Sequence, residues 1–368
     1  MTRLTSLAES LPATVPFVGP ETQERARGIA FAARLGANES VFGPSPRAVD
    51  AMATAAGDAW MYGDPEMHDL RAALAQHHDV PPEAIMCGEG IDGLLGTLVR
   101  LLAGPGDAVV TSAGAYPTFN YHVAGFGAAL HTVPYHQDRE DLDALCAKAR
   151  DVGAKLVYLA NPDNPMGTWW RADAVAALLD ALPRGTLLCL DEAYVDFAPA
   201  DAVMPFDVMD GRVIRMRTFS KAYGLAGARV GYALGTPELI AAFNRVRNHF
   251  GVGRVSQAGA LAALKDQAWL TQVVVETATA RQRLDSIARA HGLATLPSAT
   301  NFVAIDCQQD GAFARRVLAE LLARGVFARM PAVAPLDRCV RIGAGAASDL
   351  DAFEAALGPA LSAAAEAS

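Results

Sequence analysis

Residues 218–229 read TFSKAYGLAGAR, and the rest of the chain can be organised around this stretch. The run at 213–217 before it is apolar and β-branched, which is typical of a buried strand, and the glycines after Lys221 are typical of a turn. A lysine amine therefore stands at the carboxyl end of a predicted strand. Such an amine can act as a nucleophile when its surroundings favour the neutral form.

Lysine is rare in this chain, which makes Lys221 more informative. Only Lys148, Lys155, Lys221 and Lys265 are lysines among 31 Lys and Arg residues. A solvated surface lysine is the ordinary alternative at such a position. Because arginine supplies most of the positive charge here, the lysine at the strand end indicates a chemical role.

Around this stretch the sequence alternates between apolar strands and helices. The predicted strands cover 108–111, 130–133, 156–160, 187–190 and 213–217, with helices such as 94–102 and 172–182 between some of them. Near-continuous apolar strands that alternate with helices predict an α/β fold, with a mostly parallel central sheet flanked by helices on both faces.

Polar residues follow three of these strands. Asn161 follows the strand at 156–160, Asp191 follows the next one, and Thr218, Ser220 and Lys221 follow the third. The two intervals from Asn161 to Asp191 and from Asp191 to Lys221 are both 30 residues, as a repeated strand-helix-strand layout would produce. Ligands bind beyond the carboxyl ends of parallel strands, so these groups are expected to converge on one site.

The length of 368 residues exceeds the size at which one core stops growing, so more than one domain is expected. We predict an N-terminal arm at 1–34 that packs with the small domain or a partner subunit, a large domain at 35–250 and a small α+β domain at 251–368. The small domain should contain a long helix at 269–291, strands at 302–305, 326–329 and 339–342, and a helix at 312–324. Asp351 would cap a final helix that starts near Ser348.

Composition excludes several classes of protein. The net charge is −9 and no stretch gathers enough Lys or Arg to follow a phosphate backbone, so no nucleic-acid partner is expected. No apolar segment has the length and purity of a membrane span, and the N-terminus lacks a signal-peptide core, so a cytoplasmic location is expected. The five cysteines have no paired spacing and the histidines have no metal-ligand spacing, so reduced thiols and no metal are expected.

The converging residue types match the needs of one cofactor. A phosphate group needs backbone N–H groups at a helix start, hydroxyls and an arginine. A pyridine ring that must hold a positive charge needs a carboxylate beside its ring nitrogen. An aldehyde that is to form a Schiff base needs an amine. For the phosphate the chain offers Gly90, Ile91, Asp92, Thr218, Ser220 and Arg229, for the ring nitrogen Asp191, and for the aldehyde Lys221. Asn161 and Tyr194 could hydrogen-bond a phenolic oxygen on the same ring. Together they predict pyridoxal 5'-phosphate.

The sequence resembles the fold-type I pyridoxal-phosphate-dependent aminotransferases, and among them the histidinol-phosphate aminotransferase-like branch. The similar stretches follow the order of the family over nearly the whole chain. They are LGANESVFGPSP (35–46), YGDP (62–65), GEGID (88–92), PTF (117–119), NPDNPMGT (161–168), DEAYVDF (191–197), SKAYGLAGAR (220–229), NF (301–302) and VRI (340–342).

The resemblance implies a role for each matching residue at the cofactor. Lys221 would form the Schiff base and later move the α-proton. The other cofactor contacts would be Asp191 at the pyridine nitrogen, Asn161 and Tyr194 at the phenolic oxygen, Phe119 stacked on the ring, and Gly90, Ile91, Asp92, Thr218, Ser220 and Arg229 at the phosphate.

The resemblance also implies a homodimer with shared active sites, because Tyr62 corresponds to a tyrosine that reaches the cofactor phosphate of the neighbouring subunit. Arg341 would bind the substrate carboxylate, Arg329 would assist on the substrate side, and Asn38 could face the ligand or cap a turn. The amino donor would be histidinol phosphate or an α-amino acid, and the acceptor a 2-oxo acid such as 2-oxoglutarate.

Some positions depart from the branch pattern. Val41 replaces a proline, Phe17 stands where the arm often carries a tyrosine, and Gly251 replaces a common asparagine with Arg254 nearby. These departures concern the substrate more than the cofactor. A decarboxylase or oxidase of the same fold remains an alternative, and the GxGxxG pattern at 88–93 leaves an NAD-dependent dehydrogenase as a remote one.

Overall fold

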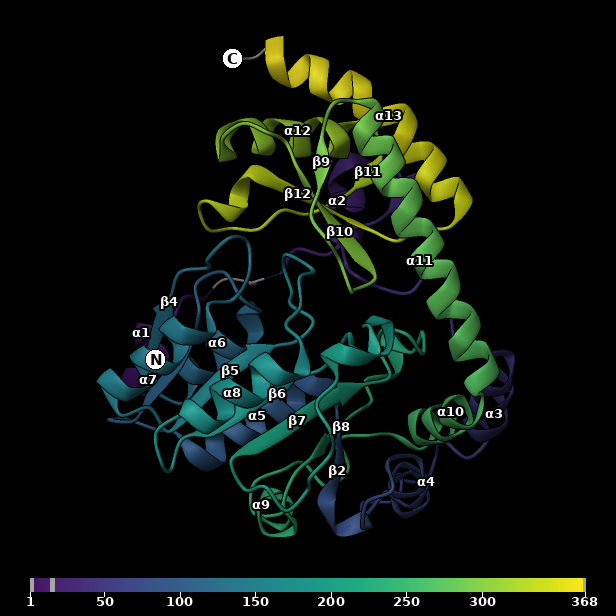
Figure 1. Cartoon of the computed structure of the whole chain (residues 1–368). Coiled ribbons are helices and arrows are strands. Elements are labelled where there is room, and N and C mark those ends of the chain that lie inside the picture. Colours follow the sequence, from purple (N-terminus) through teal and green to yellow (C-terminus); the bar gives the residue numbers. More distant parts are fainter. Residues whose placement is uncertain (1–2, 14–16, 367–368) are drawn as a thin grey trace.

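The computed structural model describes residues 3–13 and 17–366, which form a larger and a smaller unit (Figure 1). The larger unit is built on one sheet. In spatial order, its strands are β2 (Ile85–Gly88), β8 (Gly231–Leu234), β7 (Val213–Thr218), β6 (Leu187–Asp191), β5 (Leu156–Ala160), β3 (Ala108–Ser112) and β4 (Ala129–Val133). Neighbouring strands from β7 to β4 are parallel, which confirms the predicted α/β class.

Strand β8 was not predicted, and it is antiparallel to both of its neighbours, β2 and β7. The order of the strands also excludes the NAD-dependent dehydrogenase that the glycine pattern left open. The glycine pattern at 88–93 begins at the last residue of β2, and four strands lie between β2 and the next strand in the chain, β3. A dinucleotide-binding unit needs these two strands side by side, so the sheet order excludes that alternative.

Helices cover both faces of the sheet because its strands are apolar on both sides. Helices α5 (Gly90–Leu102), α6 (Pro117–Gly125) and α9 (Pro237–Phe243) pack against the face that presents Tyr158 and Met216. Helices α7 (Leu142–Val152) and α8 (Ala172–Ala181) pack against the opposite face, which presents Val157 and Leu190. Alternate strand residues therefore belong to two different cores, as expected for a sheet buried on both sides.

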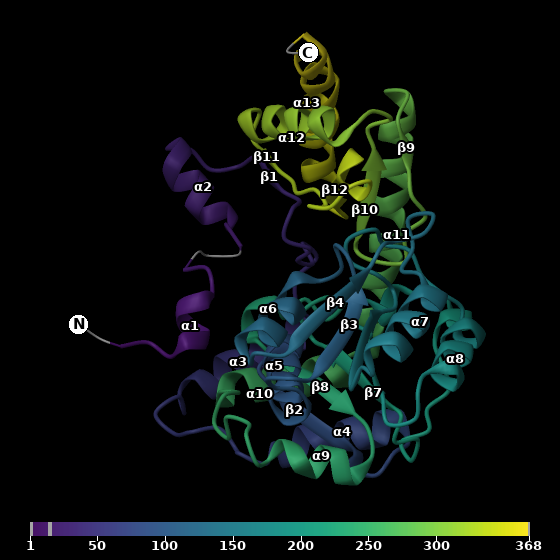
Figure 2. The same ribbon diagram turned by 90° about the vertical axis from the view of Figure 1, so that its left-hand side faces the viewer.

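The smaller unit has an antiparallel sheet in the order β12 (Cys339–Gly343), β10 (Phe302–Asp306) and β9 (Ala294–Thr295). Helices α12 (Gly311–Ala323) and α13 (Ala347–Glu366) and the end of α11 (Gln267–Ala290) share its core. The short strand β1 (Ala33–Arg34) pairs in parallel with β11 (Val326–Phe327). The end of the N-terminal arm therefore lies on the smaller unit, after the helices α1 (Ser6–Ser10) and α2 (Pro20–Arg27) (Figure 2).

The boundary expected at residue 250 differs from the observed packing. Helix α10 (Arg254–Lys265) packs on α3 (Pro46–Ala56) and α4 (His68–His78), and its residues Ala260 and Leu264 belong to the same core as Leu70. The following helix α11 passes from the larger unit to the smaller one (Figure 1). The change of unit therefore falls within α11 and not before α10.

The cap of the last helix also differs from expectation. The carboxylate of Asp349 accepts a hydrogen bond from the backbone N–H of Ala346, at 2.9 Å, while Asp351 forms an ion pair with Arg283 on α11. The helix begins at Ala347, one residue earlier than expected, so the earlier carboxylate meets the free N–H group.

In the described residues, no helix has both the length and the apolar character needed to cross a membrane.

Candidate active site

A cavity of about 940 Å³ lies beyond the carboxyl ends of β5, β6 and β7, with residues of both units in its wall. The parallel register sets Ala160 beside Asp191 and Asp191 beside Met216, so the segments that follow these strands lie next to one another. The predicted site residues in the wall are Asn38, Ile91, Asp92, Asp191, Tyr194, Thr218, Ser220, Lys221, Arg229, Arg329 and Arg341.

Lys221 reaches the cavity from the turn after β7. Its Nζ donates a hydrogen bond to the backbone oxygen of Asn38, at 3.1 Å, and lies 5.6 Å from the centre of the Tyr194 ring. The side-chain amide of Asn38 donates to the Tyr194 hydroxyl at 2.9 Å, and its Oδ1 is buried with no hydrogen-bond partner among the described residues. The amine is therefore held by one neutral carbonyl beside polar groups that can still bind a ligand.

Asp191 is a buried carboxylate at the end of β6. Its Oδ2 accepts a hydrogen bond from the hydroxyl of Tyr158 at 2.7 Å, and its Oδ1 accepts one from the backbone N–H of Ala193 at 2.9 Å. Burial raises the pKa of Asp191 to about 6, although both hydrogen bonds act in the opposite direction. A neighbouring cation would favour the ionised form, and a protonated pyridine nitrogen is such a cation.

A cradle for an anion lies at the start of α5. Gly90 has φ +73°, and a Cβ at this position would lie 2.5 Å from Nη2 of Arg229, so the arginine can approach only because the residue is glycine. Nη1 of Arg229 donates to the Ser220 hydroxyl at 3.4 Å, and Nη2 lies 3.8 Å from a carboxylate oxygen of Asp92. A guanidinium, a hydroxyl and the first N–H groups of a helix together fit a phosphate group.

Thr218 contributes less directly to this cradle. Its hydroxyl oxygen accepts a hydrogen bond from the N–H of Ser220 at 3.0 Å, and the hydroxyl donates to the carbonyl of Val230 at 3.3 Å. Both contacts are within the protein, so Thr218 fixes the turn that presents Ser220 and Lys221.

Two arginines of the smaller unit face the cavity. Arg341 donates to Oδ1 of Asn164 at 2.5 Å and to the backbone oxygen of Gly36 at 3.2 Å, and its Nε is buried with no partner among the described residues. Burial lowers the pKa of Arg341 to about 10. Since no carboxylate within the described residues forms an ion pair with Arg341, an incoming anion would find a cation with neutral partners only.

Arg329 links this wall to the N-terminal arm. Its Nη2 donates to the backbone oxygen of Val18 at 3.0 Å, and its guanidinium lies 5.6 Å from the centre of the Phe17 ring. The ring of Phe17 also lines the cavity. The arm therefore closes one side of the site through contacts with a residue expected to bind substrate.

Asn161 does not reach the cavity, contrary to expectation. Its side-chain amide donates to the carbonyls of Trp170 and Ala202, and its Oδ1 accepts from the N–H of Trp170 at 2.8 Å. Asn164, three residues later in the same motif, lines the cavity and binds Arg341. The structure thus gives Asn161 a role in shaping the loop and leaves Asn164 as the amide that can meet a ligand.

Three other predicted residues also lie away from the cavity wall. The Phe119 ring is fully buried and stacks on Tyr158, with centroids 4.5 Å apart, while Tyr116 and Tyr158 line the cavity instead. Gly90 lies behind the wall against Arg229. Tyr62 is 78% exposed on the surface and packs against Phe250.

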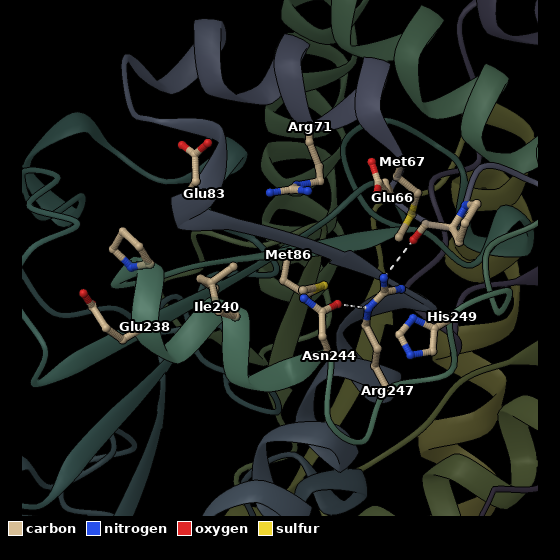
Figure 3. Close-up of a pocket in the computed structure, with 13 residues that line it drawn as sticks. Glu66, Met67, Arg71, Glu83, Met86, Glu238, Ile240, Asn244, Arg247 and His249 are labelled. Carbon is tan, nitrogen blue, oxygen red and sulfur yellow. Dashed lines mark hydrogen bonds between the residues drawn. The ribbon is translucent and has the colours of Figure 1, made fainter.

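A second cavity of about 750 Å³ lies between α4 and α9 (Figure 3). Arg247 in this cavity donates to Oδ1 of Asn244 at 2.7 Å and to the carbonyl of Pro65 at 2.8 Å. Gln257 binds the carbonyl of Asp64, and Arg254 binds that of Tyr62, both at 3.0 Å. These donors fix the backbone of the turn that carries Tyr62.

Two carboxyl groups, Glu140 and Asp163, are buried, and Asp163 belongs to the loop that carries Asn164. Glu140 accepts hydrogen bonds from the Ser112 hydroxyl at 2.7 Å and the Ala160 N–H at 2.9 Å. Asp163 accepts from the Tyr135 hydroxyl at 2.8 Å and the Met166 N–H at 3.0 Å. Burial raises the pKa of Asp163 to about 7 and that of Glu140 well above its usual value, with the Asp163 charge adding to the rise at Glu140.

These carboxyl groups predict a fall in stability with pH. A carboxyl group whose pKa is higher in the folded protein stabilises it below the unfolded pKa near 4, and this contribution is lost as the pH rises through about 7. The Asp163→Asn variant should therefore show a free energy of unfolding that falls less between pH 4.5 and pH 8, by more than about 1 kcal/mol. Urea unfolding at the two pH values measures this difference. The exposed Asp69→Asn variant is the control, and equal pH dependence in all three proteins would contradict the prediction.

Comparison with known proteins identifies the family. The model of the aminotransferase class I and II family matches residues 33–358, and the chain belongs to this family. It is 36% identical to the histidinol-phosphate aminotransferase of Anaeromyxobacter sp. (strain Fw109-5), over 95% of this chain and 96% of that protein. The protein is a pyridoxal-phosphate-dependent aminotransferase, which takes an amino donor and a 2-oxo acid.

Solved structures agree with this identification. The crystal structure of the histidinol-phosphate aminotransferase from Sinorhizobium meliloti in complex with pyridoxal 5'-phosphate has 55% sequence identity, a TM-score of 0.95 and 98% coverage of both chains. A Thermus thermophilus aspartate aminotransferase has 22% identity and a TM-score of 0.80, with 97% of this chain and 100% of that chain covered, and it supports the fold alone.

Proposed function

We propose that this aminotransferase moves the amino group of histidinol phosphate to a 2-oxo acid such as 2-oxoglutarate. The observation that carries the proposal is Arg341, a largely enclosed cation whose partners are neutral and whose Nε has no partner in the described residues. Arginine suits bidentate binding of phosphate or carboxylate, and Arg329 adds a second cation to the same wall. The names of the relatives favour histidinol phosphate over other anionic donors.

The residues present fit the cofactor. Bound pyridoxal 5'-phosphate supplies an electron sink that makes the α-proton of an amino donor acidic. Lys221 would attach to the cofactor and later move the α-proton, and Asp191 would accept a hydrogen bond from the ring nitrogen. Tyr194 and Asn164, in place of Asn161, would hydrogen-bond the phenolic oxygen. Ser220, Arg229 and the N–H groups of Ile91 and Asp92 would bind the phosphate.

A panel of single amino donors tests the substrate. Histidinol phosphate, added alone to the holoenzyme, should change the absorbance of the bound cofactor, and 2-oxoglutarate should reverse the change. Phenylalanine and aspartate, as donors without a phosphate, should give a second-order rate constant at least about 100-fold lower, because a phosphate-binding site left without its anion loses several kcal/mol. Comparable rates for phenylalanine would replace this donor assignment while leaving the aminotransferase activity in place.

We also propose that the enzyme is a cytoplasmic homodimer with shared active sites. Tyr62 lies outside the cavity of its own chain, is 78% exposed, and has its backbone fixed by Arg254. An exposed aromatic pair such as Tyr62 and Phe250 suits an interface between subunits. All five cysteines are free and buried, which supports a reducing compartment.

Mixed dimers test the shared site. Tyr62→Phe and Lys221→Ala homodimers should each be impaired, because each site lacks one of the two groups. After subunit exchange, a hybrid dimer should contain one site with neither change, so activity should rise well above that of either parent. The assay is the rate of the mixture before and after exchange, with exchange followed by native mass spectrometry. Complete exchange without recovery would place both residues in the site of one chain.

A further inference from the structure

Tyr158 lies on the same face of the sheet as Asp191. In the parallel pair of β5 and β6, Ala160 is beside Asp191, and Tyr158 precedes Ala160 by two residues. Side chains two residues apart on a strand point to the same face, so the Tyr158 phenol runs along the sheet toward the carboxylate. Its hydroxyl donates to Oδ2 of Asp191 at 2.7 Å.

The surroundings of Tyr158 fix this donor. The residue is fully buried, and its ring stacks on Phe119 with centroids 4.5 Å apart and planes 19° apart. Burial and the Asp191 charge raise the pKa of Tyr158 well above its usual value, so the phenol stays protonated. The buried Phe119 thus orders Tyr158, and Tyr158 in turn has a proton to give to Asp191.

We propose that Tyr158 is a positioning residue that keeps the Asp191 carboxylate ionised and oriented for the ring nitrogen of the cofactor. This inference rests on the role of Asp191 given in the proposed function. Within the part of the chain that the structure describes, the Tyr158 hydroxyl is the side-chain donor to Asp191, and the other donor is the Ala193 N–H. Hydrogen bonds to a carboxylate favour its charged form and limit its rotation.

Other charged groups near Asp191 do not replace this bond. Asp92 on α5 raises the pKa of Asp191, and Lys221 in the turn after β7 lowers it. The pKa values of Tyr116, Glu140 and Cys189 are also raised by the Asp191 charge, but these three residues do not hydrogen-bond its carboxylate. Without the Tyr158 hydroxyl, Asp191 becomes more basic. The single proton shared by Asp191 and the ring nitrogen then moves toward Asp191, and the ring loses its positive charge.

The test compares two ligands that differ at one ring atom. Pyridoxal 5'-phosphate and its 1-deaza analogue, which has C–H in place of the ring nitrogen, are titrated into the wild-type apoenzyme and the Tyr158→Phe variant, with dissociation constants measured by fluorescence quenching. The variant should lose about tenfold in its preference for pyridoxal 5'-phosphate over the analogue, as expected for one hydrogen bond to a charged group. Tyr232→Phe is the matched control, because it removes a buried hydroxyl that contacts His78.

A second measurement uses the carboxyl group itself. In apoenzyme with ¹³C-labelled aspartate carboxyl groups, the Asp191 resonance should titrate at higher pH in Tyr158→Phe than in the wild type. A purely structural role would weaken binding of both ligands alike and leave this titration unchanged, and either result would overturn the proposal. The Asp191→Asn variant separates the two levels of inference. If it keeps the wild-type preference for the ring nitrogen, the role of Asp191 is wrong; if only Tyr158→Phe keeps it, the role of Tyr158 alone is wrong.

Discussion

Replacing Lys221 by alanine is expected to abolish transamination, with a loss of at least about 10⁴-fold in kcat, because the variant lacks both the amine and the proton carrier. Folding should be little affected, since among the described residues the amine donates one hydrogen bond, to the carbonyl of Asn38. The variant should still bind the cofactor through the phosphate cradle and Asp191. Single-turnover rates, melting temperature and cofactor binding by equilibrium dialysis measure the three effects.

Chemical labelling provides an independent check on Lys221. Borohydride reduction of the wild-type holoenzyme should fix the cofactor on the peptide that contains Lys221. Lys155→Ala is the control, because the Lys155 amine is exposed and forms an ion pair with Asp107 at 2.8 Å. Label on Lys155 or Lys265, or near-normal turnover by Lys221→Ala, would contradict the assignment.

The second large effect is expected at Asp191. The Asp191→Ala variant should lose about 10³-fold or more in the rate of the half-reaction, because the ring nitrogen no longer faces a buried carboxylate. The free energy of unfolding at pH 8 should change by less than about 2 kcal/mol. A buried carboxyl group with a pKa raised to about 6 destabilises the folded protein when it is ionised, as it is at pH 8. Replacing Asp191 by alanine removes this destabilisation, which offsets the loss of its two hydrogen bonds.

Stopped-flow absorbance of the bound cofactor and urea unfolding separate rate from stability at Asp191. Asp196→Asn is a suitable control, because Asp196 is another carboxyl group of the same segment whose pKa burial raises to about 6, but it does not line the cavity. A near-normal half-reaction in Asp191→Ala would require another group to hold the ring charge. A large loss of stability together with rate would leave the catalytic role unproven and contradict the expected separation.

The arrangement of the parallel strands could be predicted because each strand carries its own signal. The apolar runs at 156–160 and 187–190 can be buried on both faces only in a covered parallel sheet, and this geometry brings Asp191 and Lys221 to one edge. Strand β8 was missed because its sequence, GYAL, is short and begins with a glycine. Its antiparallel direction depends on pairing with β2 and β7, which no local pattern reveals.

The choice between Asn161 and Asn164 could not be made from the motif. Both are asparagines at the end of one strand, and either amide could bind a ligand. Their roles are set by partners that are distant in sequence, since Asn161 binds the Ala202 carbonyl and Asn164 binds Arg341.

The residue that stacks on the cofactor ring could not be chosen from the motif either. Phe119 is aromatic at the expected position, but the packing of α6 turns it toward Tyr158 and away from the cavity wall.

Helix α11 has a consequence for how the molecule unfolds. Its 24 residues span about 36 Å, and they belong to two cores at once. Val273 packs in a cluster with Tyr194 and Phe302, whereas Leu284 and Ile287 lie in the core of the smaller unit. Melting this helix to release one unit would expose apolar surface in the other. Helix α11 thus couples the unfolding of the two units, as a flexible linker would not. Because Tyr194 belongs to one of the two cores, its side of the active site is expected to unfold together with them.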